Sequence, residues 1–233
     1  MIDFAHRSYK KELLDSADIP FADIKRNMQE LEIINRRLGG HKITLNGLKS
    51  LLKTVSVRQP FHIAEIGCGG GDNLKVVNEF CKKKKIKVHL TGIDINPECI
   101  EFARSKKENR GIDFITSDYR KIVLDKKPDI IFSSLFCHHF SDREIVELLH
   151  WMKKNSSAGF FINDLHRHYL AYHSIKWLTG FFSKSYLVKN DAPLSVQKGF
   201  RKKEWKNYLR QAGMSAYRIQ WRWAFRWLIT VKQ

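Results

Sequence analysis

The sequence predicts an α/β fold, in which a parallel sheet is wound with helices on both faces. Strand-like and helical patterns alternate from about Phe61 onward, which is typical of such a sheet. A glycine-rich loop follows the first of these strands and leads directly into a helical pattern. The 233 residues are enough for one α/β domain with a full core and an appendage.

The expected strands and helices follow one another in a regular order. The predicted strands are "HIAEIG", "KVHLTGIDI", "IDFITSD", "PDIIFSSLF", "AGFFINDL" and two adjacent strands within "MSAYRIQWRWAFRWLITVKQ". The predicted helices between them cover about residues 73–83, 97–107, 142–153 and 202–212.

The N-terminal part of the chain reads as helical, and we expect residues 1–57 to form a helical cap. One apolar stripe ends at a glycine pair and contains Ile24, Met28, Leu31, Ile34 and Leu38. A second helix is expected over about residues 45–55. Residues 58–233 would then form the main domain, with an aromatic and basic insert at about 166–200 that covers it.

Composition narrows the class of protein. The formal net charge of +18 favours contact with anionic partners without choosing among nucleic acid, membrane surfaces and acidic proteins. No apolar run approaches the roughly 20 residues of a membrane span. The N-terminus lacks the apolar region of a secretory signal, and the four cysteines are widely separated with no CxxC pair. We therefore expect a cytoplasmic protein without a structural zinc site.

The glycine loop, in the stretch "IAEIGCGGGDNL", predicts a bound ligand. Gly67, Gly69 and Gly71 would let a ligand approach the backbone at the carboxyl end of the first strand. The dinucleotide fingerprint G-x-G-x-x-G would require a third glycine where this chain has Asp72. A dehydrogenase is therefore disfavoured.

Three carboxylates are predicted at the same edge of the sheet. Glu65, Asp94 and Asp118 each lie at or just beyond the end of a strand. Such a set suits a ligand that has no phosphate but carries a cationic centre, a diol and an amine, as S-adenosylmethionine (SAM) does. Asp94 would accept from the ribose hydroxyls, Asp118 from the adenine amine beside Tyr119, and Glu65 would act on the ammonium end.

The stretches "IAEIGCGGGDNL", "LTGIDINPECIEFAR", "IDFITSD" and "PDIIFSSLFCHHFSD" resemble, in order and spacing, the motifs of class I SAM-dependent methyltransferases. The resemblance covers about residues 60–165. It implies a Rossmann-like, three-layer sheet of seven strands, with the last strand antiparallel. A looser resemblance points to bacterial small-molecule methyltransferases that act on quinones and aromatic polyketides. The implied cofactor site comprises Glu65, Gly67, Gly69, Gly71, Asp94, Ile95, Asp118, Tyr119 and Leu135.

Histidines near the expected ligand edge are the candidate catalytic bases. Removing a phenol proton near neutral pH suits histidine, whose ordinary pKa is about 6.5. In "SLFCHHFSD" the resemblance to plant-type phenolic O-methyltransferases puts the base at His138, with His139 second. His166, in "NDLHRH", is a third candidate. Metal ligation by Asp164, His166 and His168 is an alternative that we do not favour.

The sequence thus predicts a SAM-dependent methyltransferase of a small aromatic or apolar acceptor, most readily by O-methylation. Aromatic side chains of the insert and of the tail, such as Trp177 and Trp223, would cover the acceptor, pack in the core or contact a membrane surface. An RNA or protein methyltransferase and a non-catalytic SAM-binding protein remain alternatives. Nucleic acid is not the favoured partner, because the motifs of base methylation are missing.

Overall fold

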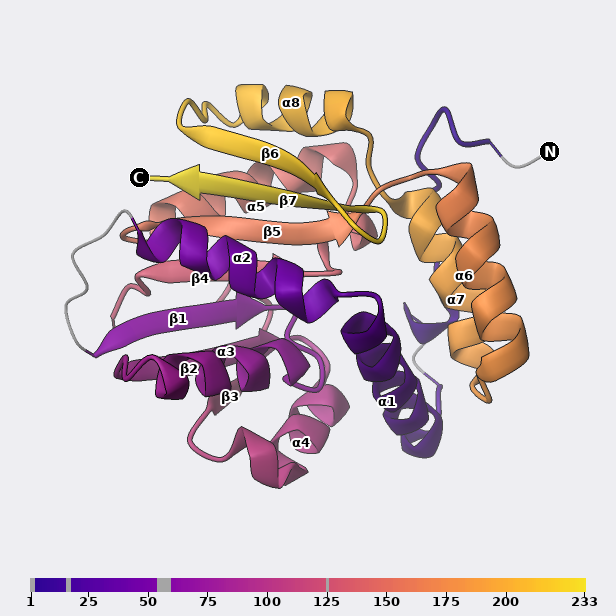
Figure 1. The fold of residues 1–233 in the computed structure, drawn as a ribbon, viewed down its shortest axis with the longest axis horizontal. Helices are drawn as coiled ribbons and strands as arrows, with labels where there is room; N and C mark the ends of the chain where they lie inside the picture. Colours follow the sequence, from indigo (N-terminus) through magenta and orange to yellow (C-terminus); the bar gives the residue numbers. More distant parts are fainter. Residues whose placement is uncertain (1–2, 16–17, 54–59, 125) are drawn as a thin grey trace.

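The computed structural model describes residues 3–15, 18–53, 60–124 and 126–233, and a single seven-stranded sheet lies at its centre (Figure 1). The strands are β1 (Phe61–Ile66), β2 (Val88–Asp94), β3 (Asp113–Thr116), β4 (Ile130–Ser134), β5 (Gly159–Leu165), β6 (Tyr217–Arg222) and β7 (Arg226–Lys232). Their order is β3-β2-β1-β4-β5-β7-β6, and β7 runs antiparallel to both of its neighbours. This arrangement confirms the fold class predicted from the sequence.

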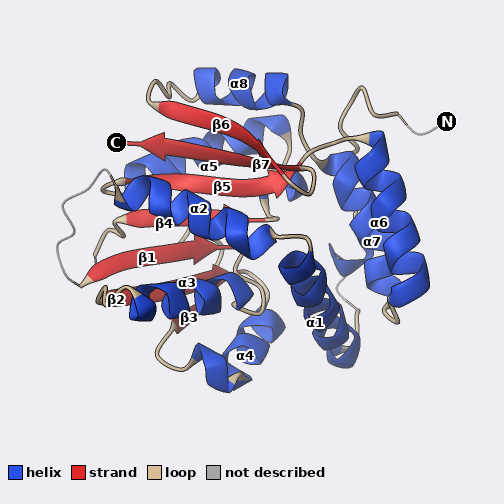
Figure 2. Ribbon diagram, in the orientation of Figure 1, coloured by secondary structure: helices blue, strands red, loops and turns tan. Residues whose placement is uncertain are grey.

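Helices cover both faces of the sheet (Figure 2). The α-helices are α1 (Phe21–Arg37), α2 (Gly40–Leu52), α3 (Asp72–Lys83), α4 (Pro97–Ser105), α5 (Asp142–Asn155), α6 (Tyr169–Phe182), α7 (Tyr186–Lys198) and α8 (Lys202–Gln211). Three short 3-10 helices are η1 (Leu13–Asp15), η2 (Lys107–Asn109) and η3 (Cys137–His139). Helices α2, α3 and α4 share one apolar cluster with the sheet, while α5 and α8 share the other.

Side chains alternate between the two faces of the sheet along each strand, so a single strand contributes apolar side chains to both clusters. In β1, Phe61 and Ile63 pack into the cluster beneath α2 to α4, whereas Ala64 and Ile66 pack into the cluster beneath α5 and α8. Successive side chains of a strand point to opposite faces, so a central strand needs apolar residues at almost every position. The sheet therefore has two cores, and polar side chains gather at its edges.

The N-terminal helices differ in position. Helix α1 ends at a left-handed glycine, Gly39 (φ 79°), and α2 begins at Gly40 rather than near residue 45 as expected. Helix α2 packs on β5 and β7 beside α3, whereas α1 extends past the carboxyl ends of the strands (Figure 1). The expected end of the second helix at Val55 and the boundary at residue 57 lie outside the described residues.

The stretch at 166–200 forms a helical hairpin of α6 and α7. It packs against η1 and η3, at the side of the molecule where β1, β4 and β5 end (Figure 1). The carboxyl ends of parallel strands are where ligands bind in folds of this kind, at the point where the strand order reverses. Here the reversal lies between β1 and β4, so the hairpin and α1 stand beside the expected ligand crevice.

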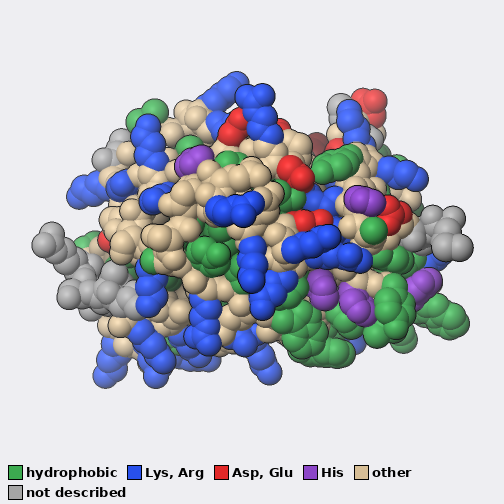
Figure 3. All heavy atoms as spheres, turned by 90° about the horizontal axis from the view of Figure 1, so that it is seen from above, with side chains coloured by type: hydrophobic (Ala, Val, Ile, Leu, Met, Phe, Trp, Pro, Cys, Tyr) green, Lys and Arg blue, Asp and Glu red, His purple; other side chains and the backbone are tan. Residues whose placement is uncertain are grey.

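Lys and Arg side chains are spread over much of the surface, while hydrophobic and His side chains gather on one part of it (Figure 3). No helix of the described residues is long and apolar enough to cross a membrane.

Two helical glycines provide a test of how tightly α2 packs on the sheet. A Cβ at Gly47 would lie 2.4 Å from the Phe161 ring, whereas a Cβ at Gly180 meets no atom within 4 Å. We expect Gly47→Ala to lower the free energy of unfolding by about 1–3 kcal/mol through overpacking. Gly180→Ala should raise it by roughly 0.5–1 kcal/mol, because alanine restricts the unfolded chain. Urea unfolding of both variants measures this, and an unchanged Gly47→Ala stability would contradict the packing.

Candidate active site

The loop after β1 is held open by backbone contacts. The amides of Gly67 and Cys68 donate to the carbonyl of Ile93, and Gly69 N donates to Asp94 Oδ2 at 2.8 Å. Gly69 has φ +49°, and an added Cβ would meet no atom within 4 Å. The loop therefore presents bare backbone to open space, as close contact with a ligand requires.

A pocket of about 100 Å³ lies beside this loop, between the ends of β1, β2 and β4. It is lined by Gly67, Ile93, Asp94, Ile95, Ser117, Asp118, Tyr119, Arg120, Phe136 and Phe140. Five predicted cofactor residues thus meet here: Gly67, Asp94, Ile95, Asp118 and Tyr119. The other four, Glu65, Gly69, Gly71 and Leu135, are not part of its lining.

Asp94 and Ile95 form the floor of this pocket at the end of β2. Asp94 accepts from the amides of Gly69 and Asn96, which fixes its carboxylate. Burial raises the pKa of Asp94 despite these bonds. Ile95 is 67% exposed, although large apolar side chains are usually covered. A ribose diol would donate hydrogen bonds to Asp94, and an apolar ring would cover the exposed side chain of Ile95.

Aromatic rings form the opposite wall. Tyr119 meets Phe136 and Phe140 edge to face, with centroids 6.2 and 6.0 Å apart. The sequence allowed Phe136 to face the cofactor or an apolar acceptor, but it did not assign Phe140 to this site. Phe136 follows Leu135, whose φ of +54° turns the chain sharply, and the Phe136 ring reaches Gly67. Such a slot has the shape and chemistry for a flat heteroaromatic ring.

Asp118 forms an ion pair within the chain that the sequence did not predict. Arg120 pairs with it in bidentate fashion, with Nη2 2.6 Å from Oδ2. The hydrogen bonds from Arg120 lower the pKa of the Asp118 carboxyl. An adenine amine would therefore share this carboxylate with a guanidinium, or Arg120 would move away.

A buried polar network lies behind the glycine loop. Asn73 donates to Glu65 Oε1 at 3.2 Å, Thr44 donates to Asn73, and Asn163 donates to Thr44. Among the described residues, Glu65 Oε2 and Asn163 Oδ1 are buried without a hydrogen-bond partner. Burial raises the pKa of Glu65 well above its usual range. Unpaired buried acceptors are costly, and an ammonium group is the donor that would complete them.

Arg226, at the start of β7, lies on the same side of the sheet. It is only 3% exposed, and its Nη1 has no hydrogen-bond partner within the described part of the chain. A Cβ at Gly40, in the first turn of α2, would lie 3.1 Å from that atom. Burial lowers the pKa of Arg226 to about 10, so it stays charged at neutral pH. The unpartnered Nη1 of this buried guanidinium, next to a helix N-terminus, is suited to a carboxylate.

The buried carboxylate of Asp164 orients the imidazole of His138, the first candidate base. Asp164, at the end of β5, lies 2.8 Å from His138 Nδ1, and its other oxygen accepts from the amides of Phe136 and Cys137. Burial opposes ionisation of Asp164, but the nearby His138 keeps its pKa below the usual value. Because a carboxylate only accepts, Nδ1 carries a proton and donates it to Asp164.

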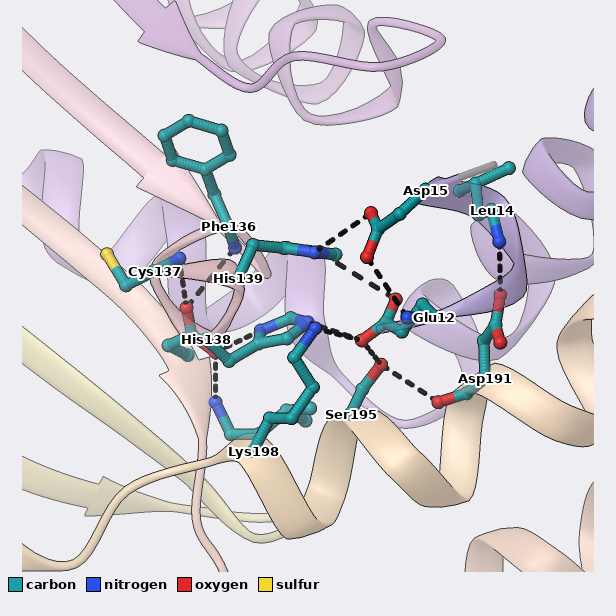
Figure 4. A network of polar contacts seen from close by, with 12 residues as sticks. Glu12, Leu14, Asp15, Phe136, Cys137, His138, His139, Asp191, Ser195 and Lys198 are labelled. Atoms are coloured by element: carbon teal, nitrogen blue, oxygen red, sulfur yellow. Dashed lines mark hydrogen bonds and ion pairs between the residues drawn. The ribbon is translucent and has the colours of Figure 1, made fainter. Parts of the chain in front are cut away.

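The N-terminal segment lies over Nε2, the other ring nitrogen of His138 (Figure 4). Glu12 Oε1 lies 3.9 Å from His138 Nε2, and Lys198 Nζ and Ser195 Oγ lie 3.1 and 2.9 Å from the same Glu12 oxygen. Arg7 holds the segment down by donating to the carbonyls of His138 and Phe140, and to Asp142. His138 is consequently only 3% exposed.

The other two histidines are weaker candidate bases. Burial, with His138 beside it, lowers the pKa of His139 to about 4. Burial likewise lowers the pKa of His166 to about 4, and its Nδ1 accepts from Trp221 Nε1 at 3.2 Å. At neutral pH both are neutral with little affinity for a proton. His138 differs from both in its direct contact with the buried carboxylate of Asp164.

Candidate metal ligands group differently from the alternative considered in the sequence. Among the described residues, the side chains close enough to share an ion are Glu12, His138 and His139, with ligand atoms within 4.8 Å of one another. Asp164, His166 and His168 form no such group in that part of the chain. The ammonium of Lys198 already lies against Glu12, so the charge of this carboxylate is balanced without a metal.

Comparison with known proteins supports this interpretation of the fold. Residues 63–158 match the family described as "Methyltransferase domain". The plantazolicin methyltransferase BpumL, solved with S-adenosylhomocysteine (SAH), has a TM-score of 0.65 and 18% identity over 90% of this chain and 99% of its own. Human N-acetylserotonin methyltransferase with SAM has a TM-score of 0.63 and 16% identity, over 92% of this chain and 56% of its own.

A third structure, the magnesium protoporphyrin IX methyltransferase of Synechocystis PCC 6803 with SAM, has a TM-score of 0.59 and 12% identity, over 94% of this chain and 99% of its own. No curated protein sequence matches the chain. The fold is that of the class I methyltransferases. Residues 63–158 are therefore a methyltransferase domain within this fold, with SAM as the cofactor. The open loop, the unpaired Glu65 oxygen and the aromatic slot all fit that cofactor.

Replacing Asp94 tests the cofactor pocket. Asp94→Ala removes the acceptor at the pocket floor, and we expect SAM and SAH to bind about 10- to 100-fold more weakly, as for the loss of hydrogen bonds to a charged group. Isothermal titration calorimetry measures both affinities. Asp113→Ala, an exposed carboxylate at the other end of the sheet, is the matched control and should bind as the native chain does. Equal affinities in both variants would refute the pocket.

Proposed function

We propose that the chain transfers the methyl group of SAM to a hydroxyl group of a small aromatic or apolar acceptor, with His138 as the base. The observation that carries this proposal is the buried Asp164–His138 pair, 2.8 Å apart, directly after the strand that borders the cofactor pocket. The named activities of the similar structures, on N-acetylserotonin, a porphyrin and plantazolicin, support an acceptor of this class.

SAM, when bound, supplies an electrophilic methyl group on a sulfonium. The chain's own residues hold the donor and prepare the acceptor. Asp164 fixes the imidazole of His138 with Nε2 free to take the hydroxyl proton, and the methyl group then passes to the acceptor oxygen. Asp164 stays beside Nδ1 of His138 while the acceptor occupies the space next to Nε2.

Access to His138 requires movement of the N-terminal segment. Glu12 lies over Nε2, so an acceptor hydroxyl reaches this nitrogen only when residues 7–15 shift outward. Polar contacts hold the segment: Arg7 donates to the carbonyl of His138, and Asp191 accepts from the amides of Leu13 and Leu14. Opening of the segment would exchange these contacts for water. The α6–α7 hairpin supplies the neighbouring wall, with Val196 and Tyr172 in a small apolar cluster.

Residues at the other end of the donor bind its amino-acid part. Glu65 and Asn163 each offer an oxygen to the ammonium, and Arg226 offers Nη1 to the carboxylate; none of these atoms has a hydrogen-bond partner among the described residues. Only Glu65 of these three was foreseen from the sequence.

His138→Ala tests the base. We expect kcat with an active phenol or hydroquinone to fall about 10²- to 10⁴-fold, the usual contribution of general base catalysis. The affinity for SAM should change less than about twofold, since His138 lies outside the pocket lining. SAH formation measures turnover on a panel of phenols and hydroquinones, and calorimetry measures SAM binding. His150→Ala, an exposed histidine on α5, is the control and should keep full activity.

Full activity of His138→Ala would move the base to another residue, and His139→Ala and His166→Ala are then compared. No turnover by the native chain on any phenol or hydroquinone, with SAM bound normally, would refute O-methylation while leaving the methyltransferase class intact.

Arg226→Met tests recognition of the amino-acid part of the donor. We expect SAH to bind roughly 10- to 100-fold more weakly, because its carboxylate loses a charged partner. Methylthioadenosine, which lacks that carboxylate, should bind Arg226→Met and the native chain equally. Asp94→Ala should weaken both ligands, so the two variants together separate the two ends of the donor. Equal loss of both ligands in Arg226→Met would instead indicate a damaged fold.

A further inference from the structure

Helix α6 exposes an apolar face that the proposed reaction does not use. Phe182 is 81% exposed, Phe181 75%, Trp177 66% and Leu170 46%. Leu170, Trp177 and Phe181 lie within one stripe of the helix, because positions seven and eleven residues apart return to the same side. The opposite side of α6, with Ala171, Tyr172 and Thr179, packs inward.

The exposed surface continues beyond α6 through aromatic contacts. Tyr169 stacks on His168, His168 on Phe225, and Phe225 lies 5.9 Å from Trp223, which is 68% exposed. We name this surface the aromatic face, and it consists of Tyr169, Leu170, Trp177, Phe181, Phe182, Trp221 and Trp223. Figure 3 shows hydrophobic side chains gathered together with histidines on one side of the molecule.

Basic side chains lie within and around this surface, and Glu30 is an acidic neighbour at the turn after α6. Helix α6 contains no Asp or Glu, and the exposed side chains of Lys176 and Lys184 accompany its aromatic residues. In Figure 3, Lys and Arg side chains also lie next to the group of exposed hydrophobic side chains. The whole chain carries a formal net charge of +18. A partner that is apolar inside and anionic at its surface complements both properties.

We propose that the aromatic face docks on the surface of an anionic lipid bilayer, with its rings in the interface and its lysines at the lipid headgroups. Trp, Tyr and Phe are favoured at that depth, and nearby Lys and Arg side chains strengthen binding to anionic lipid. The proposal rests on surface exposure and charge, and it does not depend on the acceptor or on the role of His138.

The test measures co-sedimentation of the full chain with two kinds of vesicle, one of phosphatidylcholine alone and one of equal parts phosphatidylcholine and phosphatidylglycerol. We expect binding to the anionic vesicles to be roughly tenfold tighter or more, and to weaken at high salt. Trp177→Ser with Phe181→Ser should lower that binding at least about tenfold, since two rings leave the interface. Val123→Ser, which removes an apolar side chain that is 90% exposed elsewhere, should bind as the native chain does.

A second pair of variants tests charge. Lys176→Glu with Lys184→Glu should weaken anionic binding, whereas Lys82→Glu with Lys83→Glu, the same change of charge at the far end of α3, should weaken it much less. All replaced side chains are exposed, so circular dichroism should show the native fold.

Three outcomes would overturn the proposal. Absence of binding to either vesicle would exclude a lipid surface. Equal binding to both vesicles would exclude an anionic surface as the partner. Self-association of the native chain in sedimentation equilibrium, abolished by Trp177→Ser with Phe181→Ser, would make the aromatic face a contact between two copies of this chain.

Discussion

The candidate site depends on one buried carboxylate, that of Asp164. It is inaccessible to solvent, and it accepts hydrogen bonds from the amides of Phe136, Cys137 and Leu165 and from His138 Nδ1. These bonds tie the turn after β4 to the end of β5. The same carboxylate thus places an aromatic ring at the cofactor pocket and an imidazole at the proposed acceptor side. Each bond to such a charge contributes about 1.5–3 kcal/mol, which offsets the cost of burying it.

A second carboxylate, Asp72, joins the N-terminal helices to the glycine loop. Its Oδ2 accepts from His41 Nε2 at 2.8 Å and from Asn35 Nδ2 at 3.1 Å, one residue from each of α2 and α1. Burial opposes its ionisation, but the bond from His41 keeps the pKa of Asp72 below its usual value. The aspartate that replaces the third glycine of a dinucleotide loop therefore connects α1 and α2 to the domain that binds the donor.

The site as a whole combines rigid and movable parts. The sheet, the loop after β1 and Asp164 form the rigid part, because apolar packing covers both faces of the strands. The segment from Arg7 to Asp15 is held mainly through polar side chains, and the proposed reaction requires Glu12 to leave its position over His138, which breaks its contact with Lys198. In the proposed reaction, such a segment would exclude water from the site when it closes.

The sequence by itself determined the order of strands and helices, the glycine loop and the positions of Glu65, Asp94 and Asp118, because each of these is a local pattern at the end of a strand. It also pointed to His138. Only the tertiary structure decided that Glu12 and Lys198 meet beside His138, that Arg120 engages Asp118, and that Nη1 of Arg226 is buried with no hydrogen-bond partner among the described residues. These contacts join residues far apart in the chain or depend on side-chain direction. Periodicity and spacing describe only the neighbourhood of each residue, so they could not predict such contacts.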